Sequence, residues 1–404
     1  MPLVVEISGS GLALPGKIRS REEFESLLYG PPGRTPDELA FADEEFLIDP
    51  LRFAVSPRQA RYIDPQQLLL LEVALAAFAD ADLAPEELKG SRTGVYVGMT
   101  ESDHLLGVDL AGVPPANLSS VGVGNNRGMA AGRISYAFDL RGPSMQVDST
   151  CSSGLLALHL ASAAIRDGEI DRALVIASHL VRSEQGRVLR EATGAIDPGA
   201  RCNAFTDRAA GFVVGEGVVA FVLTAAPEHA DGARVRVTTA VNQDGRTAGV
   251  TVPNRAAQED VAVRALQRAG VEPDRVAYVE AHGTGTRLGD PLEVAALTAA
   301  YRTRDRGEGR PLLIGSNKPR FGHLEAASGL LSLLVATTVR RTGIIPGTRS
   351  EGAANPGVDW SGGNVRLVRD DTPLPEHETC ALGVSAFGMS GTNVHAIVAP
   401  VQAQ

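Results

Sequence analysis

The amino-acid sequence predicts an α/β fold made of two similar halves. Short apolar segments with strand character alternate with helical segments along the 404 residues, which is typical of layered α/β proteins. A strand, a tight turn with a chemically capable side chain and a buried helix recur near Cys151, His282 and His323. The recurrence suggests two related halves, 1–232 and 233–404, although no internal repeat is strong enough to prove this.

The first half begins with a strand and contains one very apolar helix. Asp64 suits the N-cap and Pro65 the first helical position, and apolar residues then surround most of the axis as far as Asp80, which predicts a buried helix. The other predicted elements are a strand over 3–7, a glycine-bearing turn over 9–16, a helix over 21–28, mostly loop over 31–57, strands over 93–98 and 145–148, a helix over 124–137, a strand over 172–178 and two short strands over 212–223.

The second half follows a polar turn at 225–232, which is the expected seam. Asp290 and Pro291 cap a helix that runs to about Tyr301. The other predicted elements are a strand over 235–241, an amphipathic helix over 257–269, strands over 276–280 and 312–316, a nearly all-apolar helix over 324–342, and two strands around a glycine turn over 382–398.

The composition restricts the classes of function. Hydrophobic residues make up 44% and charged residues 21% of the chain, as in ordinary globular proteins. We expect a cytoplasmic protein, because no signal peptide is recognisable and no apolar run approaches the about 20 residues of a membrane helix. Cys151, Cys202 and Cys380 form neither a disulfide framework nor a metal-ligand pattern. The net charge of −10 argues against a nucleic-acid partner, and an acidic protein partner would need a local basic patch.

Cys151 is the first candidate functional residue. A short buried strand ends at Asp148, and small and apolar residues recur at helical spacing from Ser152 to about Ile165. The sulfur would therefore face free backbone N–H groups and the positive end of a helix dipole, and both favour the nucleophilic thiolate. A lone intracellular cysteine is more often a small buried core residue. The Ser-Ser-Gly sequence that follows indicates close approach to this turn, so the local pattern leaves both interpretations open.

Two histidines suit a site with this cysteine. His282 ends a buried strand within His-Gly-Thr-Gly-Thr, and His323 follows Gly322 just before the apolar helix, where glycine lets a ligand approach the backbone. Thr284 and Thr286 either cap the turn or bind a ligand. We interpret the other histidines as ordinary surface or core residues: His104, His159, His179, His229, His377 and His395.

Several spaced motifs resemble the signatures of β-ketoacyl synthases, and most closely those of the ketosynthases of bacterial polyketide synthases. The motifs are Asp148-Ser-Thr-Cys151-Ser-Ser, Glu280-Ala-His282-Gly-Thr-Gly-Thr, Lys318 with Gly322-His323, and Phe387-Gly-Met-Ser-Gly-Thr-Asn393. Three further segments extend the resemblance over nearly the whole chain: Ser56-Pro-Arg-Gln-Ala-Arg, Asp64-Pro-Gln-Gln and Asn242-Gln-Asp-Gly. Chance rarely produces so many motifs in the right order.

The resemblance implies a thiolase-like fold, in which the two halves form five layers (α-β-α-β-α), and a homodimer, with a heterodimer with a related subunit as the second possibility. It implies no bound cofactor, because substrates arrive on the phosphopantetheine of an acyl carrier protein. Cys151 would take an acyl group as a thioester, and His282 and His323 would assist decarboxylation of a malonyl-type extender. The resulting carbanion would attack the thioester and give a 3-ketoacyl product, in polyketide or fatty-acid-like biosynthesis.

The resemblance also implies supporting roles for other residues. The backbone N–H groups of Cys151 and Met389 would form an oxyanion hole, in which one donor is commonly worth about 100-fold or more in rate. Lys318 would act electrostatically near His323. Thr284 and Thr286 would bind the pantetheine amides, and Phe387 and Met389 would line the acyl gate.

The sequence departs from the family pattern in two places. The family commonly has Lys-Ser-Asn-x-Gly-His, whereas Pro319, Arg320 and Phe321 follow Lys318 here. Pro319 removes a backbone donor, and Arg320 adds charge near the second histidine. This change motivates a rival function, a ketosynthase-like acyltransferase that passes the acyl group to an amine or alcohol without decarboxylation. The second departure is Gly154, which stands where a serine is usual.

Three further classes of protein fit the sequence less well. A non-catalytic partner subunit would lack the cysteine that is present here as Cys151. A degradative thiolase would carry a second cysteine in the C-terminal glycine turn, and Cys380 lies outside that turn. A synthase primed by coenzyme A would pair one histidine with an asparagine. Because the chain ends eleven residues after Asn393, we expect a free-standing enzyme that works in trans.

Overall fold

The computed structural model describes residues 3–31, 35–46, 48–227, 235–301, 310–362 and 364–400, and the predicted boundary between 232 and 233 lies outside these residues. The helices are α1 (Arg21–Leu28), α2 (Pro57–Ala60), α3 (Pro65–Asp80), α4 (Pro85–Leu88), α5 (Leu118–Asn125), α6 (Gly128–Phe138), α7 (Ser153–Arg166), α8 (Glu184–Glu191), α9 (Arg255–Ala269), α10 (Gly289–Tyr301), α11 (Lys318–Phe321) and α12 (Ser328–Thr342). The strands are β1 (Leu3–Ala13), β2 (Thr93–Met99), β3 (Ser144–Val147), β4 (Arg172–His179), β5 (Gly217–Pro227), β6 (Val235–Gln243), β7 (Val276–Glu280), β8 (Leu312–Gly315), β9 (Ile344–Ile345), β10 (Val365–Leu367), β11 (Thr372–Pro373), β12 (Ala381–Phe387) and β13 (Thr392–Pro400).

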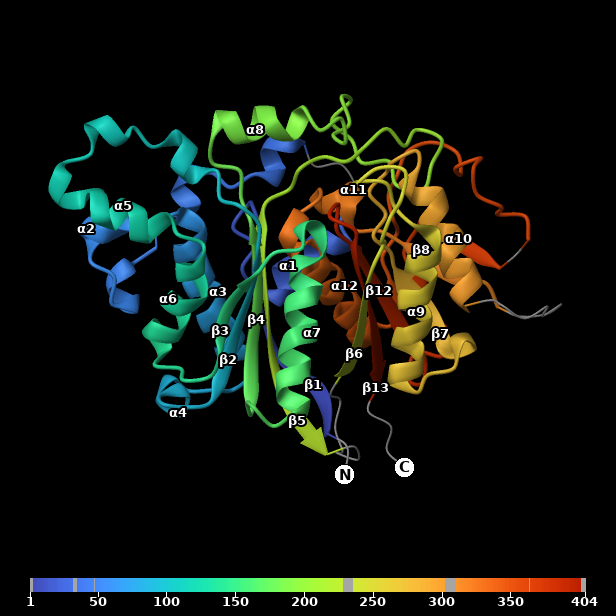
Figure 1. The fold of residues 1–404 in the computed structure, drawn as a ribbon. Helices are drawn as coiled ribbons and strands as arrows, with labels where there is room; N and C mark the ends of the chain where they lie inside the picture. Colours follow the sequence, from blue (N-terminus) through green and yellow to red (C-terminus); the bar gives the residue numbers. More distant parts are fainter. Residues whose placement is uncertain are drawn as a thin grey trace.

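The strands form two mixed sheets that meet at one edge. The first holds β3, β2, β4, β5 and β1, and the second holds β6, β13, β12, β7, β8 and β10. β1 and β6 pair at Glu6 with Arg236 and at Ile7 with Val235, which joins the two sheets into one continuous order of eleven strands, while β9 and β11 form a separate two-stranded sheet. Figure 1 shows α7 and α12 between the sheets, α3 and α6 outside the first sheet, and α9 and α10 outside the second. This is the predicted thiolase-like α-β-α-β-α arrangement.

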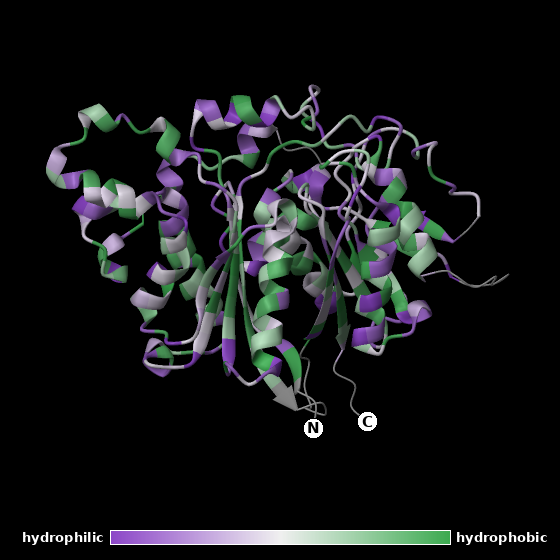
Figure 2. Ribbon diagram, in the orientation of Figure 1, coloured by the Kyte–Doolittle hydropathy of each residue, from purple (hydrophilic) through white to green (hydrophobic). Residues whose placement is uncertain are grey.

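The apolar core is divided by the sheets. In β4, Ala173, Val175 and Ala177 belong to the cluster around α7 and α12, while the alternate residues Leu174 and Ile176 belong to the cluster under α3 and α6. Both faces of the strand are therefore buried, as the uninterrupted apolar run predicts. Figure 2 shows that the strands and α7 are mostly hydrophobic. A third cluster lies under α9 and α10.

The predicted helix over 64–80 is confirmed as α3. The Asp64 carboxylate accepts a hydrogen bond from the backbone N–H of Gln66, Pro65 is the first helical residue, and Leu69, Leu70 and Leu71 are fully buried. The predictions for α1 and β7 match the observed bounds, 21–28 and 276–280. These elements carry strong local signals, namely a helix cap or a strand bounded by turn residues.

Three predictions about elements were wrong. The turn predicted over 9–16 is largely strand, because Gly9 and Gly11 lie in β1 against α3, where an added Cβ would come within 2.7 Å of backbone atoms. The helix α5 was not predicted, and the helix predicted over 124–137 begins only at Gly128. Over 212–223, one long strand begins at Gly217, and Phe212 and Val214 form only isolated bridges.

Candidate active site

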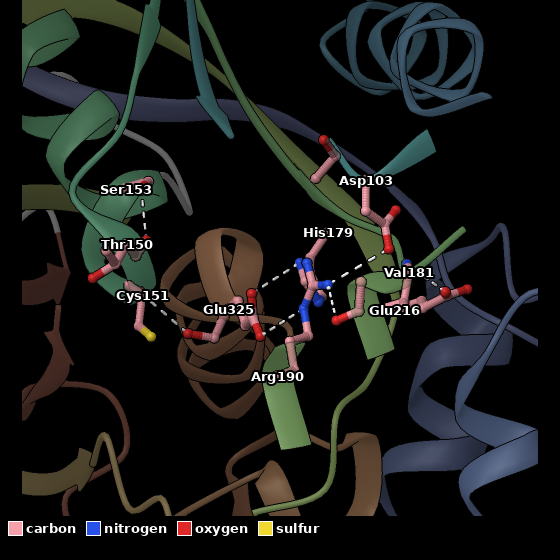
Figure 3. Close-up of polar contacts among 12 residues, drawn as sticks. Asp103, Thr150, Cys151, Ser153, His179, Val181, Arg190, Glu216 and Glu325 are labelled. Carbon is pink, nitrogen blue, oxygen red and sulfur yellow. Dashed lines mark hydrogen bonds and ion pairs between the residues drawn. The ribbon is translucent and has the colours of Figure 1, made fainter. Parts of the chain in front are cut away.

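Cys151 lies in a strained turn between β3 and α7. The preceding residue, Thr150, has φ of 58°, a left-handed conformation that costs energy for a β-branched residue. Hydroxyl groups hold the turn: the Ser153 Oγ accepts from the backbone N–H of Ser149 at 2.9 Å and donates to the carbonyl of Thr150 at 2.6 Å, as Figure 3 shows in part. One short 3-10 turn, Thr150–Ser152, separates the strand from the helix.

The small residues after Cys151 are explained by packing within the protein. A Cβ on Gly154 would lie 2.9 Å from the carbonyl oxygen of Ala326 and from the Leu330 side chain. A Cβ on Gly98 of β2 would in turn lie 2.8 Å from Gly154. The close approach that the Ser-Ser-Gly sequence indicates is therefore made by β2 and the start of α12, and a serine at position 154 would not fit.

The prediction that Cys151 is ionised at rest was wrong. Burial raises the pKa of the Cys151 thiol to about 12, and the nearby Glu325 carboxylate raises it further. The backbone N–H groups of Met389 and of Cys151 itself lower the pKa, as does Lys318, but less than burial raises it. The helix dipole and the free N–H groups act only within the local turn, whereas the loss of water around the sulfur dominates its pKa.

The C-terminal glycine turn lies directly against the Cys151 turn. A Cβ on Gly388 would come within 2.1 Å of the carbonyl oxygen of Ser149, so only glycine allows this contact. The hydroxyl of Ser390 lies 3.4 Å from the same oxygen. This packing brings the backbone N–H of Met389 to the Cys151 sulfur, while the Met389 side chain remains 49% exposed. The two predicted oxyanion-hole donors therefore both lie at the sulfur.

The His282 turn is held by buried carboxylates. Glu293, on α10, accepts hydrogen bonds from the backbone N–H groups of His282 and Gly283 at 2.7 and 2.8 Å. Asp290 accepts from the N–H of Gly285 at 3.1 Å, and also from Phe205 at 2.6 Å. Burial raises the pKa of Asp290 and of Glu293 to about 7. Gly283 has φ of 45° and sits against Ser316 and Phe205, so a side chain would neither fit nor adopt this backbone.

Lys318 links the two histidines. Its ammonium group donates to the carbonyl of His282, and the side chain is almost completely buried. The rings of His282 and His323 are 5.4 Å apart, centroid to centroid, and Phe387 lies 5.5 Å from His282. Burial, and then the Lys318 charge, hold the pKa of both imidazoles well below the ordinary range, so both are neutral. The charge of Lys318 also acts on Cys151, which ties all four side chains to one region.

His323 is held by backbone hydrogen bonds and does not directly follow a strand as predicted. The short helix α11 lies between β8 and His323, and the N–H of His323 donates to the carbonyl of Val213 at 2.7 Å. The Phe212 ring packs edge-on at 4.7 Å, centroid to centroid. The rings of His282 and His323 each have a buried Nδ1 without a hydrogen-bond partner among the described residues. Each of these nitrogen atoms can therefore form one more hydrogen bond.

Thr284 and Thr286 lie on the same turn, with their hydroxyl oxygens 3.5 Å apart. The hydroxyl of Thr286 accepts from the backbone N–H of Gly289 at 3.1 Å and so caps α10. Thr284 makes no such helix-capping bond within the described chain, and both residues are only partly buried. Thr286 therefore has the capping role that the sequence left open, and Thr284 is free to contact a ligand.

Arg320 does not bring charge to the histidines, contrary to the expectation from the sequence. Its guanidinium group donates to the carbonyls of Leu27 and Pro31 at 2.8 and 2.9 Å, so it caps the C-terminal end of α1. Pro319 occupies the first turn of α11, where a backbone N–H has no helical partner. The Pro319-Arg320-Phe321 segment thus faces away from the site, which removes the observation that motivated an acyltransferase without decarboxylation.

A charged cluster beside Cys151 is not evident from the sequence. Figure 3 shows Glu325 between Cys151 and Arg190, with His179 and Asp103 behind. His179 is a buried core residue, as the sequence predicts, and its Nδ1 lies 3.4 Å from the Glu325 carboxylate. In the sequence, these residues appear only as polar residues at the ends of apolar segments. That pattern does not show which of them pair in the folded protein.

Among the described residues, no group of three or more potential ligands could hold a metal ion. No helix in the described part of the chain has the length and apolar character needed to cross a bilayer.

Comparison with known proteins agrees with this geometry. Residues 5–229 match the family model "Beta-ketoacyl synthase, N-terminal domain", and residues 234–350 match "Beta-ketoacyl synthase, C-terminal domain". The spectinabilin polyketide synthase system protein NorC of Streptomyces orinoci is 38% identical over 98% of this chain, which spans 19% of that protein. The erythronolide synthase EryA2 of Saccharopolyspora erythraea is 38% identical over 99% of this chain, which spans 12% of that protein.

Solved structures give the same result. The ketosynthase from module 6 of the bacillaene synthase of Bacillus subtilis 168 superimposes with a TM-score of 0.87 at 28% identity, covering 99% of this chain and 72% of that one. The oxazolomycin ketosynthase domain OzmH KS8 of Streptomyces albus JA3453 gives a TM-score of 0.78 at 33% identity, covering 99% and 96%. The chain belongs to the β-ketoacyl synthase family and has the thiolase-like fold of polyketide ketosynthases.

Proposed function

We propose that this chain condenses an acyl group held on Cys151 with a malonyl-type extender, releasing carbon dioxide and a 3-ketoacyl product. The observation that carries the proposal is the grouping of one thiol, two neutral imidazoles and one buried ammonium, with two backbone N–H groups at the sulfur. A thiol and an oxyanion hole alone would suit acyl transfer. The pair of neutral imidazoles favours a reaction that also develops negative charge on the extender.

Cys151 acts as the nucleophile in the first step. Because its pKa is raised, the thiol meets the acyl thioester in protonated form. Its sulfur attacks the carbonyl carbon, the bond to the donor sulfur breaks, and the proton passes to the departing thiolate. The N–H groups of Cys151 and Met389 stabilise the tetrahedral oxyanion. The acyl group is then held as a Cys151 thioester.

His282 and His323 act in the second step. Each neutral ring donates a hydrogen bond to the thioester oxygen of the extender, where the negative charge of the enolate develops when the carboxylate leaves as carbon dioxide. The enolate carbon attacks the Cys151 thioester, a carbon–carbon bond forms and the sulfur leaves as thiolate, which recovers a proton from water. Burial and then the Lys318 charge hold the pKa of both rings low, so both are neutral, and Lys318 adds a positive field at the developing charge.

The substrates arrive on the phosphopantetheine of an acyl carrier protein. Thr284 and Thr286 offer hydroxyls beside His282 for the amides of that arm, and Phe387 and Met389 border the passage to the sulfur. The chain requires no bound cofactor for this chemistry, which uses only its own thiol, imidazoles and backbone donors. The reaction belongs to polyketide or fatty-acid-like biosynthesis in the cytoplasm.

The functional unit is a homodimer of chains whose halves are 1–232 and 233–404. β3 lies at the end of the strand order and pairs only with β2 among the described strands, so its outer edge is free to hydrogen-bond with a second copy. Exposed apolar side chains surround this edge, including Met145 on β3 and Met129 and Tyr136 on α6. A related subunit with the same edge would give a heterodimer by the same contact.

The decisive experiment incubates the purified protein with an acyl carrier protein loaded with a short acyl group and a second loaded with malonyl. We expect a Cys151 acyl adduct by intact mass spectrometry, then carbon dioxide and a 3-ketoacyl carrier. Acylation followed by transfer to an amine or alcohol, with no carbon dioxide, would instead establish the acyltransferase function. Absence of any adduct on Cys151 would indicate a non-catalytic partner subunit.

A further inference from the structure

A chain of charged side chains lies beside the Cys151 sulfur and is not used by the proposed reaction. The Glu325 carboxylate lies 3.3 Å from the Nε of Arg190 and 3.4 Å from the Nδ1 of His179. Arg190 lies 3.5 Å from Asp103 on its other side. Asp103 accepts from the backbone N–H of Arg182 at 2.8 Å, so the far end of the cluster is anchored (Figure 3).

Glu325 is the member of the cluster that reaches the reacting region. It starts the 3-10 turn Glu325–Ala327, which packs against the Thr150–Ser152 turn. Figure 3 shows its side chain beside Cys151, where, after burial, its charge raises the pKa of the thiol. Its φ of 38° is unusual for a residue with a side chain, and such strain is retained when the surrounding structure requires it. The backbone is therefore held in a costly conformation that places a carboxylate next to the nucleophile.

The cluster has hydrogen-bonding capacity that the protein does not use. The side chains of Glu325 and Arg190 are each 18% exposed, so neither is fully enclosed by the described residues. The Nη2 of Arg190 donates to none of the described residues, and its Nη1 donates to the carbonyl of Gly186 at 3.0 Å. The Nε2 of His179 is buried and also lacks a partner among the described residues. A carboxylate can accept about four hydrogen bonds, so Glu325 can accept more than it does.

We propose that the Arg190–Glu325 pair forms a polar wall of the acyl-binding site and selects acyl groups that carry a hydroxyl on the second or third carbon. This inference rests on the proposed function, because it assumes that Cys151 carries the acyl group. A hydroxyl can donate to Glu325 and accept from Arg190, which replaces the water lost when the acyl chain binds. A plain alkyl group would displace that water without forming a hydrogen bond to either residue. Its binding would therefore be opposed by the desolvation of the ion pair.

The test compares matched thioesters in the loading step. In this step the acyl–sulfur bond of an N-acetylcysteamine thioester breaks, the acyl–Cys151 bond forms, and the thiol proton moves to the released thiol. We expect either the 2-hydroxybutyryl or the 3-hydroxybutyryl thioester to acylate Cys151 about ten- to a hundredfold faster than butyryl, as for one hydrogen bond to a charged group. The readout is the second-order rate constant of adduct formation by intact mass spectrometry.

Variants separate selection from folding. Arg190→Met should reduce the hydroxyl preference to below about threefold, chiefly by accelerating butyryl, and Glu325→Gln, which keeps the shape of the side chain, should reduce it as well. Arg187→Met is the matched control: it lies on the same helix, is paired with Glu184 and is well exposed, so the preference should not change. Alkylation by iodoacetamide checks in each variant that the thiol is intact.

Two outcomes would overturn the inference, and they differ in what else they affect. Equal acylation by hydroxybutyryl and butyryl thioesters, or a preference that survives both Arg190→Met and Glu325→Gln, would refute the polar wall while leaving the proposed function in place. A Cys151 thiol that reacts with iodoacetamide but with none of the thioesters would refute both.

Discussion

The turn that presents Cys151 and the turn that presents His282 both connect a strand to a helix, but they are held by different chemistry. Hydroxyls and close backbone packing hold most of the cysteine turn, through Ser153 and Gly154, and its carboxylate contact is the exposed bond from the Thr150 N–H to Asp148 at 3.0 Å. Buried carboxylates hold the histidine turn, through Glu293 and Asp290. At the histidine turn, the ammonium of Lys318 offsets the acidic charge.

The largest effect is expected from removing the nucleophile. Cys151→Ala should abolish the acyl adduct completely, because the attacking atom is gone. Cys380→Ala, which removes a buried thiol far along the chain, should leave acylation unchanged. Intact mass spectrometry after incubation with an acyl thioester distinguishes the two variants. An acyl adduct that persists in Cys151→Ala would mean that a residue other than Cys151 is the nucleophile.

Removing either imidazole should impair condensation but leave acylation of Cys151 intact, which would show that the two turns have different functions. His282→Ala and His323→Ala should still form the Cys151 adduct but condense about 100- to 10,000-fold more slowly, as when a positioned acid–base group is lost. His377→Ala, a histidine bonded to the Arg340 carbonyl, is the control. Adduct formation and product release are measured separately. Loss of acylation in the histidine variants would contradict this division of labour.

The pH dependence of thiol reactivity tests the electrostatics of the Cys151 turn. Because burial raises the pKa of Cys151 to about 12, the thiolate fraction should rise about tenfold for each pH unit, and alkylation by iodoacetamide should rise about 100-fold from pH 7 to pH 9. The profile should show no plateau in this range. A plateau near pH 7 to 8 would indicate that the helix terminus and the N–H donors outweigh burial.

The smallest effect is expected from weakening the carboxylate that holds the histidine turn. Glu293→Gln leaves one of the two buried N–H groups, of His282 or Gly283, without an acceptor, which should lower the free energy of unfolding by about 1–3 kcal/mol. Glu259→Gln, on an exposed pair with Arg255, should change it by less than about 0.5 kcal/mol. Urea unfolding measures both variants. Equal stability of the two would show that the carboxylate is not what holds the turn.

The sequence predicted elements best where the signal is local. Asp64 and Pro65 define the start of α3 through capping that involves only neighbouring residues. Gly9 and Gly11 suggested a turn wrongly, because they allow contact with α3, which lies more than 60 residues away along the chain. In the site, the motifs located Cys151, His282, His323 and Lys318, and the structure brings these residues into one region.

The sequence could not predict which charged side chains pair with each other or how deeply the site residues are buried. Arg190 and Glu325 are 135 positions apart, and no periodicity relates them. Arg320 was expected near His323 because the two are close in sequence, yet its side chain points to the end of α1. The ionisation of Cys151 was predicted wrongly for the same reason, since the water around a sulfur depends on every element that packs over it.

The strand directions separate the Cys151 turn from the outer ends of the first and last described strands. β13 leaves the glycine turn at Thr392 and runs to Pro400, and β1 begins at the far end, where Leu3 pairs with Pro227. Figure 1 shows both chain ends on one side of the molecule. A tether fixed at either end would have to cover roughly 30 Å, the length of a nine-residue strand, before its cargo met the sulfur. The Cys151 turn, which packs against Gly388 and Ser390, and the outer ends of β1 and β13 therefore lie at opposite ends of the strands.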